Sequence, residues 1–490
     1  MRVVRSVVRS AVRLALILVA LLAVPAGALG QQLAVGEPFA FTTDPDAVGI
    51  VSSVLARSGA AWTMAAEPSS VECPGPQISA VAPDGIAEAW IGYIPTPAGR
   101  SVPGPFVHCP VSPATLVAAG SSATVAWITA TGEGTSHERY EIYAQQCSLR
   151  GECLDYPARL VASWPSTARV TTENSNLPPA VWPQPALASS GSSSVLVFDS
   201  FGGPDQQMMW AQGSASSVFA PVHSFGVGGD WDPVAVSEPG GRVFAAWFEG
   251  IGSDRNALYS SGVRIAYAQY TPGHGFGAVH ATAAGKGSTC TQLAIAPTSS
   301  GVTLAWLQGN TPYGSGTQFA DPLWTLTVQG DHASKAKIAD ARASTFSLGG
   351  GGDVVALAPW YRGDGANPAL VQTSVDGQPF AAPVELDPNA GPAEVGVDSN
   401  GDTLATWFAG PSTTSTDGSE ELAVAAPGAA FSAPVELMLP VAPAFTASAL
   451  DGTPAVHLET VGSRSLITSM SGYPPLQQGQ PTIYGVIVKS

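Results

Sequence analysis

A two-part phrase that recurs along the chain is the feature that most constrains its fold. The copy at 393–437 opens with AEVGVDSNGDTLATWFAG, crosses a polar spacer and closes with ELAVAAPGAAFSAPVEL. Each part consists of two short apolar runs joined by Gly, Asn, Asp or Pro. This is the pattern of a β-hairpin, because glycine accepts the positive φ of a tight turn. The phrase therefore predicts a repeating unit of four short strands.

The copies of the first part align on one position that is usually aromatic. It is filled by Trp90, Trp127, Phe198, Trp247, Trp306, Ala358, Trp407 and His457. The intervals between residues 90 and 457 average about 52 residues, a period typical of a β-propeller. We therefore expect an all-β chain that forms a single β-propeller of about eight four-stranded blades. Seven blades are the alternative, and a solenoid is the competing architecture.

The recurrence of a large side chain at this position has a structural explanation. One large flat ring per blade would fill the space between neighbouring twisted sheets. Ala358 departs from the pattern, and Trp360, two residues on and on the same strand face, is the expected substitute. Helical repeats are excluded, because no unit shows an apolar period of 3.6 residues.

Residues 1–30 have the composition of a signal peptide. Four arginines precede an apolar run from Leu14 to Val24, which is too short to span a bilayer comfortably. Pro25 ends the run, and Ala26-Gly27-Ala28 offers a small-residue cleavage site. We expect cleavage after Ala28, or after Gly30 as second choice, with an uncleaved signal anchor as the alternative. The propeller then occupies residues 31–490, and the protein is secreted or lies at the cell surface.

The charge of the chain limits its partners. The formal net charge is −17, and removal of the four arginines of the signal segment would lower it to about −21. Such a surface repels nucleic acid and anionic membranes. We expect a soluble monomer without a membrane span after cleavage, whose partner is an extracellular glycan or protein.

Both ends of the mature chain contain strand-like segments. The stretch from Pro38 to Thr42 reads PFAFT, and the stretch from Thr482 to Lys489 reads TIYGVIVK. A propeller protects its edges when strands from the two termini complete one blade. We expect these segments to close the ring. The largest insertion, between Trp127 and Phe198, is expected on a face of the propeller, where ligands usually bind.

The chain has five cysteines, which suits an exported protein. Cys147 and Cys153 flank a short loop, and Cys73 and Cys109 bracket the first repeat, so we expect two disulfides. Spacing alone leaves all three connectivities of these four residues open. Cys290 is expected to be a small buried hydrophobe. The spacings match no zinc pattern, and neither a metal nor another cofactor is expected.

Two acidic stretches are candidate ligand sites. Asp398, Asn400 and Asp402 alternate as in the opening of a calcium loop, but the acidic Glu that would complete the loop is missing. A hairpin turn explains them better. Asp230-Trp231-Asp232 has the composition of a carbohydrate contact, since a ring stacks on a sugar face and carboxylates accept from hydroxyls. An ordinary loop leading into a strand explains this segment better.

Hydrolase motifs are absent from the sequence. The chain contains no G-x-S-x-G nucleophile elbow, and its seven histidines show no ligand spacing. No catalytic residue is assigned.

Two resemblances follow from the repeats. The stretch Ser374-Val-Asp376-Gly377-Gln-Pro-Phe380 partly resembles the Asp-box turn of sialidase-type propellers, although Thr is missing and the aromatic comes one residue early. Full resemblance would imply sialidase activity, which also needs an arginine triad that this chain does not match. The Ala/Gly-rich units that end in F-x-A-P-V resemble exported bacterial β-propeller repeat proteins, a set without one assigned role.

Two functions remain open at this point. The first is a binding protein that presents loops to a glycan or protein. The alternative is a carbohydrate-active enzyme, a glycoside hydrolase or lyase, that uses carboxylates of the central channel. A pair of inward carboxylates about 5–10 Å apart would favour the enzyme.

Overall fold

The structure is a computed structural model of the 490-residue chain. The residues that it describes are 33–41, 49–66, 77–81, 92–93, 114–119, 122–131, 139–148, 159–165, 185–200, 207–214, 219, 221–226, 229–250, 262–282, 285–286, 289–309, 321–329, 332–360, 368–390, 392–409, 419–439, 456–471 and 482–490. The expected signal peptide lies outside these ranges.

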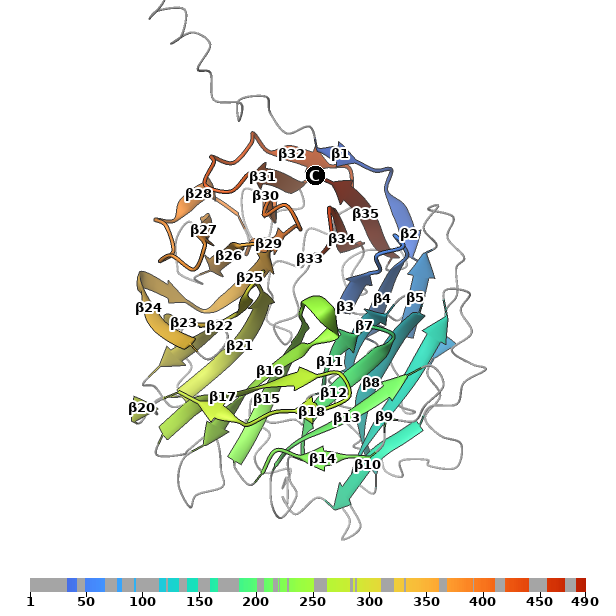
Figure 1. The fold of residues 1–490 in the computed structure, drawn as a ribbon. Coiled ribbons are helices and arrows are strands. Elements are labelled where there is room, and N and C mark those ends of the chain that lie inside the picture. The colour runs from blue at the N-terminus through green and yellow to red at the C-terminus, as the bar shows by residue number, and fades with distance from the viewer. Residues whose placement is uncertain are drawn as a thin grey trace, which may run out of the picture.

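Eight antiparallel sheets follow one another along the chain and form the blades of a β-propeller (Figure 1). Blade 1 comprises β3 (Gly49–Leu55), β4 (Ala61–Ala66), β5 (Gln77–Val81) and β6 (Gly92–Tyr93). Blade 2 comprises β7 (Ala114–Ala119), β8 (Ser122–Thr131), β9 (Arg139–Ser148) and β10 (Arg159–Pro165). Blade 3 comprises β11 (Pro185–Ser190), β12 (Ser193–Asp199), β13 (Met208–Ser214) and β14 (His223–Ser224).

The middle blades repeat this arrangement. Blade 4 comprises β15 (Gly229–Ser237), β16 (Val243–Gly250), β17 (Gly262–Thr271) and the short outer strands β18 (Gly275–Phe276), β19 (His280–Ala281) and β20 (Gly285–Lys286). Blade 5 comprises β21 (Thr289–Pro297), β22 (Gly301–Gly309), β23 (Asp321–Gln329) and β24 (His332–Ala343). Blade 6 comprises β25 (Thr345–Gly351), β26 (Val354–Trp360), β27 (Ala369–Val375) and β28 (Val384–Asp387).

The last two blades complete the ring. Blade 7 comprises β29 (Glu394–Val397), β30 (Thr403–Ala409), β31 (Ser419–Ala425) and β32 (Val435–Leu437). Blade 8 comprises β33 (Val456–Val461), β34 (Arg464–Ser471) and β35 (Thr482–Lys489), and its outer edge is formed by β1 (Ala34–Val35) and β2 (Phe39–Phe41). The main expectation of eight blades is therefore confirmed, and the alternative of seven is wrong.

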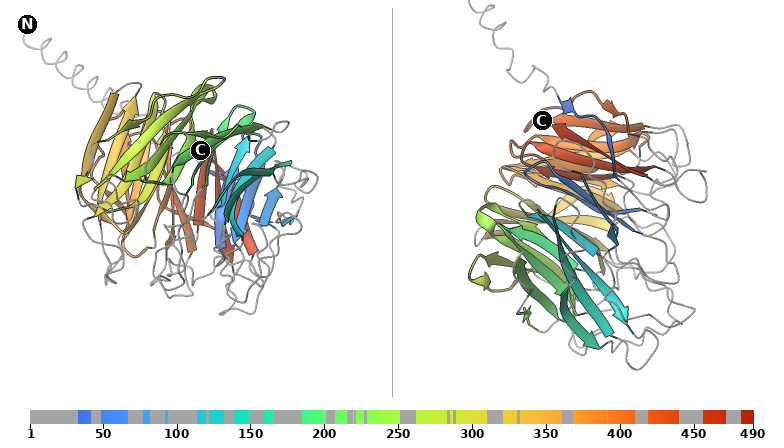
Figure 2. Two further views of the ribbon diagram at one scale, coloured as in Figure 1. Left: turned by 90° about the horizontal axis from the view of Figure 1, so that it is seen from below. Right: turned by 90° about the vertical axis from the view of Figure 1, so that its right-hand side faces the viewer.

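The ring is built around the first strand of each blade. These strands contact one another from blade to blade, including β33 with β3, which brings the last blade against the first. Figure 2 shows the blades from two further sides, standing next to one another around the ring. The described residues contain no α-helix, and no helix among them is long and apolar enough to cross a membrane.

The two chain ends close the ring as expected. Ala34 and Val35 pair with Lys489 and Val488, and Phe39–Phe41 pair with 483–485. Figure 1 shows the blue N-terminal strands beside the red C-terminal strands. Because β1 and β2 cover the edge of β35, this strand presents no long unpaired edge to solvent.

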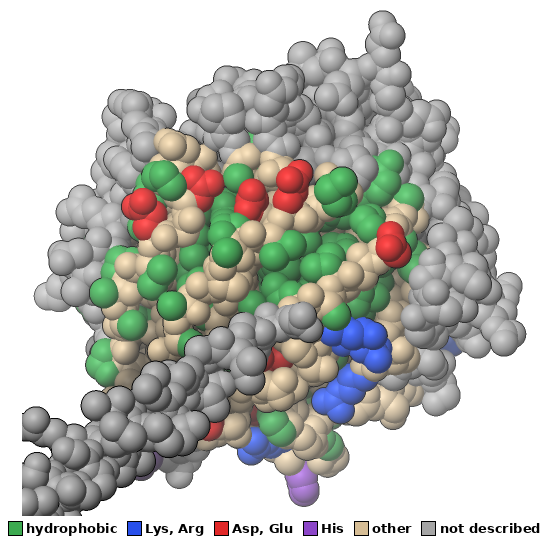
Figure 3. All heavy atoms as spheres, turned by 90° about the horizontal axis from the view of Figure 1, so that it is seen from above, with side chains coloured by type: hydrophobic (Ala, Val, Ile, Leu, Met, Phe, Trp, Pro, Cys, Tyr) green, Lys and Arg blue, Asp and Glu red, His purple; other side chains and the backbone are tan. Residues whose placement is uncertain are grey.

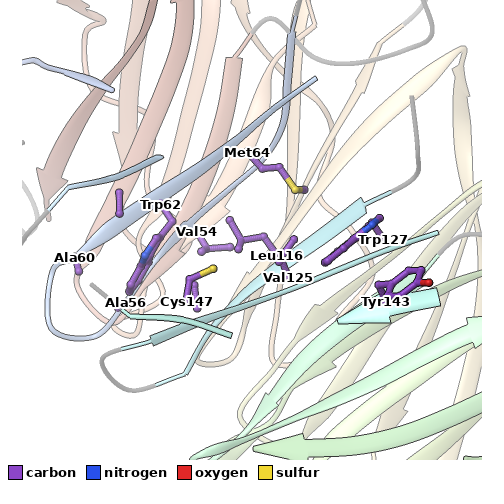
Figure 4. Packing of buried hydrophobic residues seen from close by; sticks show 12 residues of the cluster. Val54, Ala56, Ala60, Trp62, Met64, Leu116, Val125, Trp127, Tyr143 and Cys147 are labelled. Atoms are coloured by element: carbon purple, nitrogen blue, oxygen red, sulfur yellow. The ribbon is translucent and has the colours of Figure 1, made fainter. Parts of the chain in front are cut away.

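The tryptophans fill the spaces between blades, which confirms their predicted structural role. Trp127, Trp247, Trp306 and Trp407 are all buried. Figure 4 shows Trp127 of blade 2 in a cluster with Trp62 and Met64 of blade 1. Trp127 also stacks on Tyr143, with ring centroids 5.8 Å apart. Each ring removes a large apolar area from water at an interface between twisted sheets.

Two aligned positions were assigned wrongly from the sequence. His457 lies on β33, the first strand of blade 8, and the chain turns back only at Gly462, whose φ is +65°. Phrases of alternating apolar residues look alike on first and second strands, so the alignment slipped by one strand. The stretch 77–92 was likewise taken as a first hairpin, but β5 is the third strand of blade 1. Trp90 lies outside the described residues.

The departure at Ala358 has a different cause. Ala358 packs with residues of blade 7, whereas Leu357 packs with Ala305 and Leu307 of blade 5. The hairpin of blade 6 pairs Gly351 with Val354, leaving a two-residue turn, which is shorter than the turn of blade 5. A one-residue shift reverses the face on which every following side chain lies. Trp360 is buried on β26, and its role as the substitute stays a prediction.

Glycines allow the first strand of blade 6 to pass very close to its neighbours. A Cβ at Gly350 would lie 2.3 Å from the carbonyl oxygen of Pro297, and one at Gly351 would lie 2.4 Å from that of Asp398. These two contacts lie on blades 5 and 7. Glycine is therefore required by packing at 349–351, because any side chain there would meet backbone.

Candidate functional site

A cleft of about 230 Å³ opens between blades 5 and 6, at the end of the blades where the hairpin turns lie. Blade 5 contributes its first turn and the ends of β22 and β23, and blade 6 contributes its two turns and the ends of β26 and β27. The lining residues are Thr298, Ser299, Ser300, Thr303, Thr327, Gln329, Asp353, Val355, Ser374, Asp376 and Gly377. The floor is formed by buried residues, and the rim by exposed residues of the turns.

The cleft exists because small polar residues replace large apolar ones on the facing blades. Thr303 directly follows Val302, the residue of β22 that closes the first hairpin of blade 5. The corresponding residue is Phe244 in blade 4 and Leu404 in blade 7. Both of these apolar side chains pack into cores between blades. Deeper in the interface of blades 5 and 6, Leu307 and Leu357 restore an apolar core. The interface is therefore closed below and open at the turns.

Hydrogen bonds hold the walls of the cleft in place. The hydroxyl of Ser299 donates to a carboxylate oxygen of Asp353, which joins the turns of the two blades. The amide of Asp376 donates to the carbonyl oxygen of Asp353 at 2.8 Å. On the floor, the hydroxyls of Thr303 and Thr327 lie 3.3 Å apart.

One buried hydroxyl among the described lining residues has no partner. The Oγ1 atom of Thr298 is buried and makes no hydrogen bond in the structure. A buried hydroxyl without a partner costs free energy, and a ligand or water in the cleft would relieve that cost.

The turn that resembles an Asp box forms one wall of this cleft. Ser374 is buried, and its hydroxyl donates to the carbonyl oxygen of Gln378 at 2.5 Å, which shapes the turn. Asp376 has a φ of +53°, a conformation that is uncommon for a residue other than glycine. The carboxylate of Asp376 is exposed at the rim. The resemblance covers a turn, as expected, and the turn borders the cleft.

A second group of ionisable residues lies on first strands, which border the central axis. Asp232 on β15, Glu394 on β29 and Glu459 on β33 are partly buried. Burial raises the pKa of each of these carboxyl groups to about 7. Such groups are candidates for proton transfer near neutral pH.

Asp232 departs most from ordinary geometry. It lies in the irregular pairing of β15 between Trp231 and Val234, and its φ is +50°. One carboxylate oxygen, Oδ1, is buried without a partner. The Asp230-Trp231-Asp232 segment is thus part of a bulged strand, and the favoured prediction of an ordinary loop leading into a strand is wrong.

Glu394 is held by the neighbouring blade. Its carboxylate accepts a hydrogen bond of 2.8 Å from the hydroxyl of Ser347 on β25, and this hydroxyl in turn accepts from the amide of Val395 at 3.1 Å. Ser347 therefore fixes the side chain of Glu394 where blades 6 and 7 approach each other.

Glu420 is the most deeply buried of the acids. It lies on β31 with no exposed surface, and burial together with the nearby Glu394 and Glu421 raises its pKa to about 8. Its oxygen Oε1 lies 2.5 Å from the hydroxyl of Thr406, and its oxygen Oε2 has no partner.

The imidazole of His457 is desolvated in a way that affects its charge. Burial lowers the pKa of this ring to about 4, and its Nδ1 atom is buried without a partner. The ring is therefore neutral at neutral pH. Neither His457 nor the acids on the first strands gather into a group of three or more possible metal ligands within the described part of the chain.

The calcium-like sequence at Asp398 forms a hairpin turn, as preferred. Asp398 is buried and accepts from the amides of Asn400 and Asp402 at 2.7 and 2.9 Å. Its second oxygen accepts from the hydroxyl of Ser490 at 2.5 Å. Gly401 has a φ of +86°, which the turn requires. The carboxylate is occupied by its own turn and by the C-terminal residue.

The disulfide candidates are tested only slightly. Cys147 is buried on β9 in the cluster between blades 1 and 2. Cys73, Cys109 and Cys153 lie outside the described residues, so the two pairings remain predictions. Cys290 lies on β21, where its backbone is paired with that of Gln308 on β22.

The sequence did not point to most of the cleft. The available signal was a polar residue at a strand position that is apolar in other blades. Thr303 is an example, because the corresponding residues are Phe244 in blade 4 and Leu404 in blade 7. The same signal marks Thr406 and Glu420 in blade 7. It becomes apparent only when the strand registers of several blades are known.

Comparisons with known proteins leave the family of this chain unassigned. No family model matches the chain, and no curated protein matches it. Among solved structures, a polysaccharide lyase described as an ulvan lyase is 11% identical, with a TM-score of 0.49, covering 76% of this chain and 93% of its own. The α-L-arabinofuranosidase Arb93A from Fusarium graminearum is 12% identical, with a TM-score of 0.39, covering 94% and 98%. The β-propeller domain of the trilobed protease from Pyrococcus furiosus is 9% identical, with a TM-score of 0.39, covering 78% and 94%.

Likeness at this level concerns the fold alone. A propeller hosts many functions, so the fold does not identify the reaction or the ligand. Any functional conclusion has to come from the residues of this chain.

Proposed function

We propose that the protein is an exported binding protein that holds a glycan in the cleft between blades 5 and 6. The observation that carries this proposal is the lining of the cleft. Six of its residues bear hydroxyl groups: Thr298, Ser299, Ser300, Thr303, Thr327 and Ser374. An amide and two carboxylates complete the polar set, and Val355 is the apolar member.

This chemistry suits a ligand that is itself rich in hydroxyl groups. Hydroxyls both donate and accept, and the carboxylates of Asp353 and Asp376 accept only. A sugar ring offers matching donors and acceptors around its whole edge. The volume of about 230 Å³ is enough for a sugar residue and less than a typical drug-sized pocket.

Glycan-array binding of residues 31–490, followed by calorimetry with each hit, tests the proposal. Binding that is lost when Thr303 is replaced by Leu, the residue of blade 7 at this position, would support it. Thr373→Leu is the matched control, because Thr373 precedes Ser374 on β27 and does not line the cleft. An array without hits, or hits that Thr303→Leu leaves unchanged, would overturn the proposal and shift the weight to a protein partner.

A glycoside hydrolase or lyase is the second candidate. It is favoured by Asp232 and Glu394, whose raised pKa values near 7 suit a general acid at neutral pH. Product analysis of each array hit, with Asp232→Asn and Glu394→Gln variants, tests it. Turnover that either variant abolishes would support an enzyme, and binding without products would exclude one for those glycans.

Export and oligomeric state complete the proposal. Residues 1–30 act as a cleaved signal peptide, and the mature protein is a secreted or cell-surface monomer. The N-terminal sequence of protein from the culture medium, together with its mass by light scattering, tests both points. An intact N-terminus in the membrane fraction would replace this proposal with a signal anchor.

A further inference from the structure

The ionisable residues among the described lining of the cleft all have one sign of charge. Asp353 and Asp376 are its ionisable residues, and the described residues that line it include no Lys, Arg or His. Both carboxylates lie in exposed turns at the rim. The floor, by contrast, is neutral and hydroxyl-bearing. A ligand in the cleft therefore meets hydroxyl groups below and negative charge at the entrance.

The two acidic residues are fixed relative to each other. The backbone of Asp376 donates to the backbone of Asp353 at 2.8 Å, so the two turns of blade 6 are joined directly. The side chain of Asp353 is further held by Ser299 of blade 5. Carboxylates on ordered turns lose little conformational entropy when a ligand binds between them.

An independent observation indicates that a polar ligand belongs between these turns. The Oγ1 atom of Thr298 is buried in the same lining and has no hydrogen-bond partner. Buried hydroxyls in folded proteins are almost always satisfied. A hydroxyl-bearing ligand would supply the missing partner.

A divalent metal fits this entrance poorly. Calcium takes six to eight oxygen ligands, and the described residues contain no group of three or more potential acidic, His or Cys ligands. An organic cation that also bears hydroxyl groups fits better. Its positive charge suits the acidic rim, and its hydroxyl groups suit the hydroxyl-bearing floor.

We propose that the cleft selects an amino sugar with a free, protonated amine, such as a residue of a glucosamine oligomer, over neutral and acidic sugars. This inference rests on the proposed function and specifies its ligand. The ammonium group lies at the rim by Asp353 and Asp376, and the ring hydroxyls face Thr303, Thr327 and Ser374. A uronic acid or sulfated sugar is repelled by the same carboxylates.

The size of the preference for the protonated amine follows from the solvent exposure of the Asp353 and Asp376 carboxylates. Two solvent-exposed charge pairs of ordinary strength give a preference of about tenfold at low salt. The preference should shrink as salt is added, because surface charges are screened.

The experiment compares matched oligomers on the full mature chain by calorimetry. The ligands are glucosamine, N-acetylglucosamine and glucuronic acid oligomers of equal length. The variants are Asp353→Asn and Asp376→Asn, and the control is Glu385→Gln, which removes one exposed negative charge from β28 of the same blade. We expect the glucosamine oligomer to bind about tenfold more tightly than the acetylated one, and each Asn variant to lose about threefold.

The outcomes separate this inference from the proposed function. Equal binding of the glucosamine and acetylated oligomers, unchanged by either Asn variant, would overturn the amine preference and leave glycan binding intact. Glucosamine binding that Glu385→Gln weakens as much as Asp353→Asn would also overturn it, since the acidic surface as a whole would then be responsible. Binding of none of the three oligomers, and of no other glycan, would overturn both proposals.

Discussion

The hydroxyl of Thr406 lies between two acceptors, 2.5 Å from Oε1 of Glu420 and 2.9 Å from the carbonyl oxygen of Glu421. A hydroxyl has one proton, and a carbonyl oxygen only accepts. Thr406 donates to Oε1 of Glu420, and this hydrogen bond lowers the pKa of the carboxyl group less than burial raises it. The net result is a pKa of about 8 for Glu420. Glu420 is thus a neutral carboxylic acid in the core of blade 7 at neutral pH.

The first prediction concerns stability against pH. Asp232, Glu394, Glu459 and Glu420 have raised pKa values of about 7, 7, 7 and 8 in the folded protein. Between their unfolded pKa values near 4 and these folded values, the folded state binds more protons, so stability falls as pH rises. His457, with its pKa lowered to about 4, acts in the opposite direction below about pH 6.5. Four groups outweigh one, and the melting temperature should be higher at pH 5 than at pH 8.5.

Thermal melts of the mature chain across this pH range measure the effect directly. A melting temperature that rises steadily from pH 5 to pH 8.5 would contradict the burial of these acids in their neutral form.

The second prediction isolates Glu420. Glu420→Gln keeps the shape of the protonated side chain and cannot ionise, so the variant should lose less stability than the wild type between pH 5 and pH 8.5. A tenfold weaker acid in the folded state corresponds to about 1.4 kcal/mol of lost stability once the group ionises. Glu385→Gln is the control, because Glu385 is an exposed carboxylate on β28 of the neighbouring blade. Parallel pH profiles for wild type and Glu420→Gln would show that Glu420 is not neutral in the fold.

The third prediction concerns the cleft. Thr303→Leu should fill the space between blades 5 and 6 and abolish ligand binding, since an apolar side chain would occupy the floor. The fold should survive, because Leu404 occupies the same position in blade 7. Circular dichroism and a melting temperature within a few degrees of the wild type check the fold, and calorimetry checks binding. Retained binding would place the ligand elsewhere on the ring.

The fourth prediction concerns the close approach of blades 6 and 7. Gly351→Ala places a Cβ 2.4 Å from the carbonyl oxygen of Asp398, and a backbone atom cannot move aside cheaply. We expect a loss of about 1–3 kcal/mol in the free energy of unfolding. Gly277→Ala is the control, since its Cβ would meet its nearest neighbour at an ordinary 3.7 Å. Equal denaturation midpoints for the two variants would refute this account of the glycine run.

The fifth prediction concerns ring closure. Phe41 on β2 is buried against Leu55 of blade 1 and Leu466 and Ile483 of blade 8. Phe41→Ala should cost about 3–5 kcal/mol, because it leaves a cavity where the two ends of the ring meet. Val35→Ala, at an exposed site on β1, should cost less than about 0.5 kcal/mol. Chemical denaturation compares the two, and a small effect of Phe41→Ala would mean that the ring stays closed without this contact.

The outer edge of the ring differs in character from the cleft. Val384, Val435 and Met438 are exposed there, and Glu436 lies near enough to Glu421 to raise the pKa of that carboxyl. Figure 3 looks onto the side of the molecule that carries β32 and β1, and it shows acidic side chains in a row beside apolar ones. The negative charges next to the apolar residues oppose pairing of these edge strands with other chains.

Local patterns were enough to determine the architecture. Alternating apolar residues and Gly-containing turns specify hairpins through short-range backbone sterics, and their period specifies the number of blades. Edge protection alone predicted the pairing of 38–42 with 482–489. Trp127, Trp247, Trp306 and Trp407 were placed correctly because a large apolar ring has few alternatives to burial between sheets.

The registers and the site were decided by the tertiary structure. Whether Ala358 or Leu357 faces blade 5 depends on the register of the hairpin, since a shift of one residue reverses the faces of the strand. The cleft is lined by Thr303 of blade 5 and Ser374 of blade 6, which are far apart in the chain. The neutral state of Glu420 depends on desolvation, which arises only when the surrounding blades have packed around it. Contacts between distant residues carry no signature in a single sequence, and the ligand-binding properties of this protein consist of such contacts.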